Sequence, residues 1–326
     1  MSFTELEAEV AGLASGGTPG GQQIEGRSPM RLAWARLRKD RVAIASLIVI
    51  ILLILMAVAA PLIGKWLGYQ PDIGDRTYGT TVDGLPVGPS GRHLLGTDRL
   101  GRDVLVRTIY GARVSLLVGL TATAIATVAG VVIGTFAGYY GGPMDTFLSR
   151  MMDVTLSFPY LLMAVALAAA FGASTTLTII VIAFFSFASI GRIVRGQVLS
   201  LKEREFVEAA RSLGANRLRI MFVDVVPNLV AQVTVLASLT IPASIIFEST
   251  LSFLGAGADP RTPSWGNQLA DATDVYQIAP WTLFVPAGAL LLTTLAFNML
   301  GDAVRDALDP RAERIFAAQK KNKKRK

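Results

Sequence analysis

The sequence contains no cysteine and a single histidine, His93. Disulfide-built secreted scaffolds are therefore excluded, and almost nothing is left from which to build a soft-metal site such as zinc. Charged residues are also scarce, at 17% of the 326 positions against about 25% in soluble domains. The remainder is strongly apolar, with a mean hydropathy of +0.49. This composition is typical of an integral membrane protein.

Motifs for catalysis and energy conversion are missing as well. The chain has no Gly-Xaa4-Gly-Lys-Ser/Thr motif, so it cannot hold ATP phosphates in a P-loop. The apolar segments contain neither a Ser/His/Asp arrangement nor a series of acids that could relay protons. We therefore expect a protein that is not an enzyme and that has no cofactor of its own. Nucleic-acid binding is not expected, because most of the chain is apolar enough to lie in lipid.

Long apolar stretches predict six transmembrane helices. A hydrocarbon core about 30 Å thick requires roughly 20 helical residues at 1.5 Å each. Residues 155–191 carry no charge, and this stretch is too long for one crossing, so the turn at 171–176 is taken to divide it into two spans. The other four spans are residues 42–63, 115–139, 227–254 and 281–300. The predicted fold is an all-α membrane protein with six transmembrane helices.

The distribution of lysine and arginine predicts that both termini are cytoplasmic. With that orientation 23 of the 31 basic residues lie inside and 8 outside. The basic run at 320–326 is expected either to attract anionic lipid or to be simply solvated. The chain would then divide into a disordered cytoplasmic leader (1–30), the first helix with an extracytoplasmic loop (31–112), a five-helix domain (113–302) and a cytoplasmic basic tail (303–326).

The segment between the fourth and fifth spans, about residues 200–222, is predicted to form two short helices. Gly214 stands where a left-handed residue commonly closes a helix, and Pro227 opens the next span, where its missing N–H costs nothing. Such a helix could lie on lipid at the interface or dock into a groove on a soluble partner. One face of the first helix carries apolar residues at three-to-four spacing: Phe206, Ala209, Ala210 and Leu213.

Glu248 is a carboxylate within an otherwise apolar span, and ionisable residues in such positions are commonly functional. The 21 residues that follow Pro227 place it roughly 32 Å along the helix, near the outer surface. Contact with substrate and a hydrogen bond that packs helices or closes a gate are both compatible with that position.

The loop before the second span holds a further group of polar candidates. Glycine and short acidic side chains favour turns there, and several of the charges are close enough in sequence to pair. The group could brace the loop, or it could contact a substrate-delivering protein or the entrance of a pathway. No metal site is predicted, because the histidine has no second imidazole nearby. The residues are His93, Asp98, Arg102, Asp103 and Arg107.

These motifs resemble the membrane subunits of ATP-binding-cassette importers. The spacing of Glu208, Ala209, Ala210, Gly214 and Pro227 matches the family's EAA loop, although Asp224 and Val226 depart from its usual aliphatic residue and leucine. Three further segments resemble the C-type permeases of dipeptide, oligopeptide and nickel importers, with Val106 in place of a usual serine. They are residues 93–113, 248–266 and 298–311, and the resemblance covers residues 30–311.

The resemblance implies a type I importer fold, with residues 113–302 as its transmembrane domain, in a bacterial inner (cytoplasmic) membrane. It implies that the EAA residues form a coupling helix that fits a cleft on an ATPase subunit. The implied partners are a homologous permease, two ATPase subunits that bind ATP and Mg, and an extracytoplasmic substrate-binding protein. The implied cargo is a di- or oligopeptide, with nickel or another small solute as the alternative. From the residues alone, a stand-alone secondary transporter remains an alternative function. Such a transporter would require coupling charges at mid-membrane or an inverted repeat.

Overall fold

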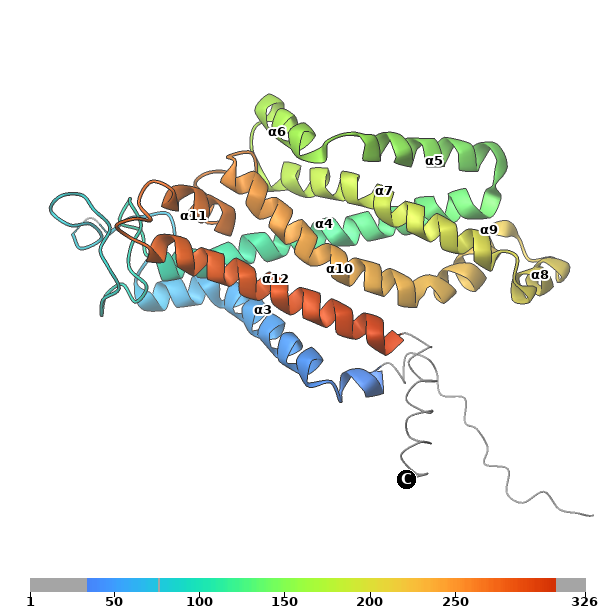
Figure 1. Ribbon diagram of the computed structural model, residues 1–326, viewed down its shortest axis with the longest axis horizontal. Coiled ribbons are helices and arrows are strands. Elements are labelled where there is room, and N and C mark those ends of the chain that lie inside the picture. The colour runs from blue at the N-terminus through green and yellow to red at the C-terminus, as the bar shows by residue number, and fades with distance from the viewer. Residues whose placement is uncertain (1–33, 76, 309–326) are drawn as a thin grey trace, which may run out of the picture.

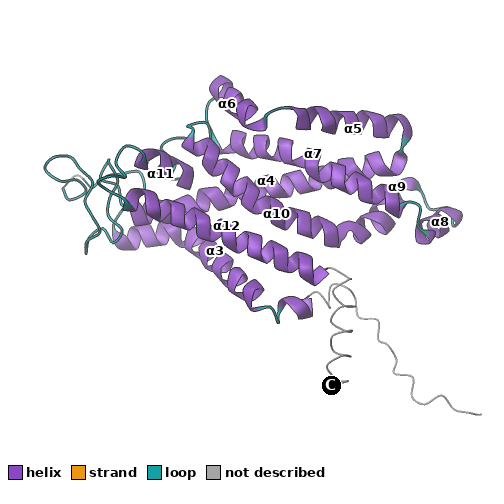
Figure 2. Ribbon diagram, in the orientation of Figure 1, coloured by secondary structure: helices purple, strands orange, loops and turns teal. Residues whose placement is uncertain are grey.

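The structure is a computed structural model, and it describes residues 34–308 except residue 76. The predicted leader and most of the predicted tail, including the basic run at 320–326, lie outside the described residues. Long helices run side by side in one bundle, and loops gather at one end of it (Figures 1 and 2). The short helix α8 (Glu205–Ser212) projects from the opposite end (Figure 1).

Six crossings account for the bundle. In the described part of the chain, five helical segments are long and apolar enough to span a membrane, and the bent pair α5–α6 passes the same test when taken together. Counted as one span, that pair makes the sixth crossing, so the predicted six-helix membrane fold is confirmed. The helices are α3 (Arg41–Leu67), α4 (Val104–Tyr140), α5 (Gly142–Ser157), α6 (Tyr160–Phe171), α7 (Thr175–Leu201), α9 (Arg217–Arg219), the π-helix η1 (Ile220–Val225), α10 (Val226–Phe253), α11 (Trp265–Ala272) and α12 (Trp281–Leu308).

The third crossing differs from the prediction. It begins at Gly142 rather than near residue 155, and it bends by 81° between α5 and α6. Pro159 causes the break, because proline lacks an N–H and holds the preceding Phe158 in an extended conformation (φ −76°, ψ 136°). The predicted start of this crossing was wrong because it was taken from a charge-free run, whereas α5 carries charges that pair with α7.

Three apolar clusters hold the helices together. The cluster at the α8 end joins α4, α5, α7 and η1 around Val198 and Met221. A second cluster joins α4, α6, α7 and α10 around Val118 and Phe247. The third packs α3, α4, α10 and α12 around the fully buried Trp265 of α11. Apolar packing therefore extends from the loop end to the α8 end.

Glycines at every fourth position let α4 lie close against α7. A Cβ on Gly130 would lie 2.9 Å from the carbonyl oxygen of Phe187, and a Cβ on Gly138 would lie 2.8 Å from Val198 Cβ. On Gly134 an added Cβ would overlap the carbonyl oxygen of Gly191. Small residues at this spacing allow close approach of transmembrane helices.

We expect Gly134→Ala to destabilise the bundle, because the added methyl group would push the α7 backbone away. Overpacking of this kind typically costs about 1–3 kcal/mol. The melting midpoint of the purified chain in detergent should fall. Gly196→Ala is the matched control on α7, since nothing lies within 4 Å of its added Cβ. Equal melting midpoints for the two variants would contradict this packing.

Candidate functional site

α8 is fixed to the bundle along one side only. Val207 is fully buried in the apolar cluster at this end, together with Ile220 and Met221. Ala210 is half-buried against the same cluster. Val207 was not predicted from the sequence, although its spacing of three residues from Ala210 is the signal of a helix side that faces a core. These two residues anchor α8 and leave its other side open.

The open side of α8 carries both charged and apolar groups. Glu208 and Ala209 are exposed, and so are Phe206 (41%) and Leu213 (89%). Of the four residues on the predicted apolar face, only Ala210 turns inward. An exposed helix side that mixes apolar and charged side chains is suited to docking in a groove on a protein.

Gly214 gives the segment its shape. Its φ of +79° lies in the left-handed region that favours glycine. The N–H of Gly214 donates to the carbonyl of Arg211 at 3.0 Å, and the N–H of Ala215 donates to the carbonyl of Ala210 at 3.1 Å. The turn therefore closes the end of α8 and redirects the chain into α9.

The junction with the next span differs from the prediction of a second short helix that ends near residue 223. Instead α9, η1 and α10 form one continuous helical segment from Arg217 to Phe253. In the π turn the N–H of Val226 donates to the carbonyl of Met221, and Pro227 stands in the first turn of α10. A π turn tolerates the missing proline N–H, so the helix continues without a break.

Glu248 is completely buried in α10 and satisfied by hydroxyl groups. Its Oε2 accepts a hydrogen bond from Ser115 Oγ of α4 at 2.7 Å, and its Oε1 accepts one from Ser252 Oγ at 2.8 Å. Ser249 Oγ lies 3.3 Å from Oε2. Ser252 Oγ also accepts from the N–H of Ala258 at 3.0 Å. This geometry joins α4, α10 and the following loop, and it favours helix packing over contact with substrate.

Arg102, Arg107 and Asp98 belong to one ion-pair network with α11. Asp98 Oδ2 accepts from Arg102 Nε at 2.6 Å and lies 3.4 Å from Arg107 Nε. Asp271 Oδ2 of α11 lies 2.6 Å from Arg102 Nη2 and 3.4 Å from Arg107 Nη2. Arg107 is fully buried and also donates to the carbonyl of Pro71 at 2.8 Å. The network braces the loop against the bundle.

His93 lies beside this network and is held by two carboxylates. Its Nδ1 is 2.9 Å from Asp103 Oδ2, and its Nε2 is 3.5 Å from Asp75 Oδ2. The ring packs on Tyr69 with the centroids 4.7 Å apart. Backbone hydrogen bonds, chiefly from Thr77, hold the pKa of Asp75 below its ordinary value. The predicted outer-loop residues thus come together, and their arrangement favours bracing of the loop over contact with a substrate-delivering protein.

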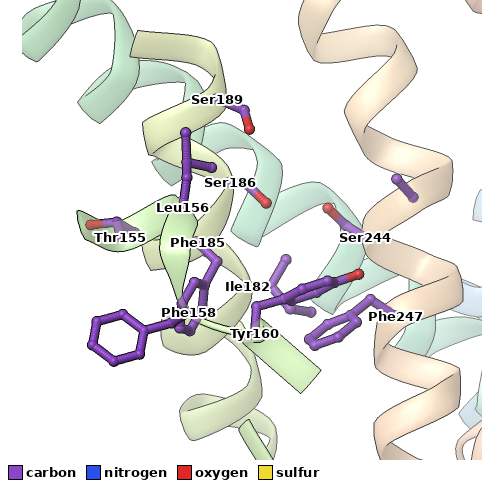
Figure 3. Close-up of a pocket in the computed structure, with 11 residues that line it drawn as sticks. Thr155, Leu156, Phe158, Tyr160, Ile182, Phe185, Ser186, Ser189, Ser244 and Phe247 are labelled. Carbon is purple, nitrogen blue, oxygen red and sulfur yellow. The ribbon is translucent and has the colours of Figure 1, made fainter. Parts of the chain in front are cut away.

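A hollow of about 260 Å³ opens where α5 breaks into α6 (Figure 3). The ring of Tyr160 stacks on Phe247 of α10 with centroids 4.2 Å apart, and Phe185 of α7 lies 6.0 Å from Tyr160. Ser186 and Ser244 contribute hydroxyl groups to the same lining. Apolar walls with a few polar groups suit an organic ligand. Sequence reasoning missed this hollow because four helices contribute to it.

Comparison with known proteins identifies the family. Residues 130–314 match the family described as the inner membrane component of binding-protein-dependent transport systems. The chain belongs to this family. Residues 28–78 of the permease also match the N-terminal transmembrane domain of oligopeptide transport permease C.

Several relatives resemble the permease over most of its length. The dipeptide transport system permease protein of Alkalihalophilus pseudofirmus is 40% identical over 293 residues, which are 90% of this chain and 93% of that protein. The oligopeptide transport system permease protein of Haemophilus influenzae is 39% identical over 289 residues, 89% and 91% of the two chains. A glutathione transport system permease protein of Pectobacterium atrosepticum is 39% identical over 285 residues, 87% and 92% of the two chains.

The fold also has a solved counterpart. An inward-facing structure of the MetNI methionine ABC transporter superposes on 63% of this chain and 97% of that chain, with a TM-score of 0.52 at 15% identity. The likeness supports the type I importer fold expected from the sequence. The protein is therefore an ABC importer permease of the peptide and glutathione family, and a multi-pass protein of the inner membrane.

Proposed function

We propose that this permease forms half of the translocation pathway for di- or oligopeptides, and that an ATPase subunit drives it through α8. The observation that carries the proposal is the geometry of α8, which is anchored by Val207 on one side and open along Glu208 and Leu213 on the other. The distribution of lysine and arginine predicts that both termini are cytoplasmic, and with that orientation α8 would lie on the side on which ATP is available.

Force on α8 would be transmitted in two ways. Val207 ties α8 to the apolar cluster shared by α4, α5, α7 and η1. The turn at Gly214 leads into the continuous segment from Arg217 to Phe253. A displacement of α8 would then move α10, which lines the hollow at the α5–α6 break through Phe247. ATP hydrolysis on the partner subunits would thereby change the access of the pathway.

The cargo is assigned from two supports. Relatives that match about nine-tenths of the chain are named for dipeptide and oligopeptide transport. The rings and hydroxyl groups around Tyr160 suit an organic molecule, whereas a nickel path would need hydrated or metal-ligating walls. A homologous permease, two ATPase subunits with ATP and Mg, and an extracytoplasmic binding protein complete the proposed assembly.

Co-purification and uptake test this function. The tagged permease, expressed together with its genomic neighbours, should bring down ATPase subunits and a second permease. In proteoliposomes with the binding protein, peptide uptake should require ATP. Uptake of nickel without peptide would identify the alternative cargo. Uptake by this chain alone, driven by an ion gradient, would instead identify a secondary transporter.

A further inference from the structure

A second, charged hollow lies between α5 and α7, toward the α8 end of the bundle. Its volume is about 480 Å³, which is within the usual range for small-molecule sites. The two helices lie alongside each other there (Figure 1). Its charged lining residues are Asp145, Arg150, Asp153, Arg192 and Arg195.

The charges in this hollow do not balance. Arg195 and Asp145 form a bidentate ion pair, with Arg195 Nε 2.5 Å from Asp145 Oδ1 and Arg195 Nη2 2.7 Å from Asp145 Oδ2. Asp153 is shared between two guanidinium groups, at 2.5 Å from Arg192 Nη2 and 3.8 Å from Arg150 Nη1. Three arginines therefore face two carboxylates, which leaves one positive charge uncompensated.

The arginines that share Asp153 are accessible. The side chain of Arg150 is 79% exposed and that of Arg192 is 54% exposed. Arg192 follows Thr175, the first residue of α7, by 17 residues, or about 26 Å of helix in a hydrocarbon core about 30 Å thick. Arg192 therefore lies near the edge of the hydrocarbon core, where a long basic side chain can reach water.

The charged hollow lies one helical turn from the hollow at the α5–α6 break. Asp153 on α5 is three residues from Leu156, and Arg192 on α7 is three residues from Ser189, so each pair shares a helix face. Both Leu156 and Ser189 line the hollow of Figure 3. One strip along α5 and α7 therefore runs from aromatic rings and hydroxyl groups to an excess of positive charge.

We propose that Arg150 and Arg192 form a binding site for a carboxylate group of the cargo. The free C-terminal carboxylate of a peptide would share the two guanidinium groups with Asp153 and would neutralise the uncompensated charge. Guanidinium–carboxylate hydrogen bonds are charge-assisted and directional. This site rests on the proposed transport function, and it would bind the cargo carboxylate near the inner mouth of the pathway. The phosphate of a lipid headgroup is the competing occupant.

The test uses the complete importer in proteoliposomes with two probes, alanyl-alanine and its C-terminal amide. The binding protein is the same throughout, so its own preference cancels in the ratio of variant to wild-type uptake. Arg192→Gln should lower uptake of the free acid about tenfold and leave that of the amide unchanged. Arg192→Lys, which keeps the charge, should retain most of the free-acid uptake. Arg41→Gln at the start of α3 is the control, since it loses a charge on another helix.

Three results would overturn the site. If Arg192→Gln lowers uptake of the free acid and of the amide equally, Arg192 has only a structural role. If Arg41→Gln lowers uptake of the free acid as much as Arg192→Gln does, the arginines contact lipid headgroups. If Arg192→Gln leaves uptake of both probes unchanged, Arg192 has no role in transport. Melting of the detergent-purified importer without binding protein gives a second readout. Millimolar alanyl-alanine should raise the wild-type midpoint but not that of Arg192→Gln. If the wild type shows no ATP-dependent uptake of any peptide, the proposed function fails, and the melting shift still decides the carboxylate site.

Discussion

Gly214→Pro is expected to abolish ATP-coupled uptake while leaving membrane insertion and the bundle intact. Gly214 has a φ of +79°, and proline is restricted to about −65°, so the turn after α8 cannot form. The N–H that donates to the carbonyl of Arg211 is lost as well. Without this turn, α8 would lose its orientation relative to the bundle in which Val207 is buried. Movement of the partner ATPase would then no longer be transmitted to α10. Uptake in proteoliposomes and the yield of inserted protein measure the two effects.

Asparagine is the informative control at this position, because it adopts the left-handed conformation more readily than other side chains. Gly214→Asn should therefore keep most of the uptake. Glu208→Arg should also abolish uptake, since it reverses a charge on the open side of α8 without changing the turn. Normal uptake with Gly214→Pro or Glu208→Arg would refute the coupling role of this segment.

Glu248→Ala is expected to give the largest loss of stability. The substitution leaves a cavity and removes the acceptor shared by Ser115 and Ser252. Orphaned buried hydroxyl groups and an unfilled cavity should together cost about 3 kcal/mol. The melting midpoint of the purified permease should fall clearly, and uptake should fall with it, because the carboxylate joins α4 to α10.

Glu248→Gln separates packing from charge. The amide keeps nearly the same volume and one carbonyl acceptor, so most of the stability should remain. If Glu248 instead contacts cargo, Glu248→Gln would impair uptake at an unchanged melting midpoint. That result would contradict the helix-packing role assigned to this residue.

Features encoded locally could be predicted from the sequence. Charge-free runs predicted five of the six crossings, because the length of an apolar segment must match the hydrocarbon core. The turn at Gly214 followed from a glycine after a run of helix formers. Glu248 stood out because an isolated carboxylate in an apolar helix is expensive and needs partners.

Features that depend on distant residues could not be predicted. The first half of the third crossing was missed because Asp145 and Asp153 are neutralised by arginines of α7, some 40–50 residues later. Asp271 was missed because its partner Arg102 is 169 residues away. The hollow beside Tyr160 needs four helices in place before it exists. Pairings across helices leave no periodic signal in a single sequence.

Labelling of a single cysteine tests whether the open side of α8 meets an ATPase subunit. The chain has no cysteine of its own, so Leu213→Cys gives a single reactive site at a side chain that is 89% exposed. Val82→Cys in the outer loop, where the side chain is fully exposed, is the control. Modification by a maleimide should be rapid at both sites in the permease alone. Adding the ATPase subunits should protect Leu213→Cys and leave Val82→Cys unchanged. Protection of Leu213→Cys by the bilayer alone, with no change when ATPase subunits are added, would show that α8 lies on lipid and does not meet an ATPase subunit.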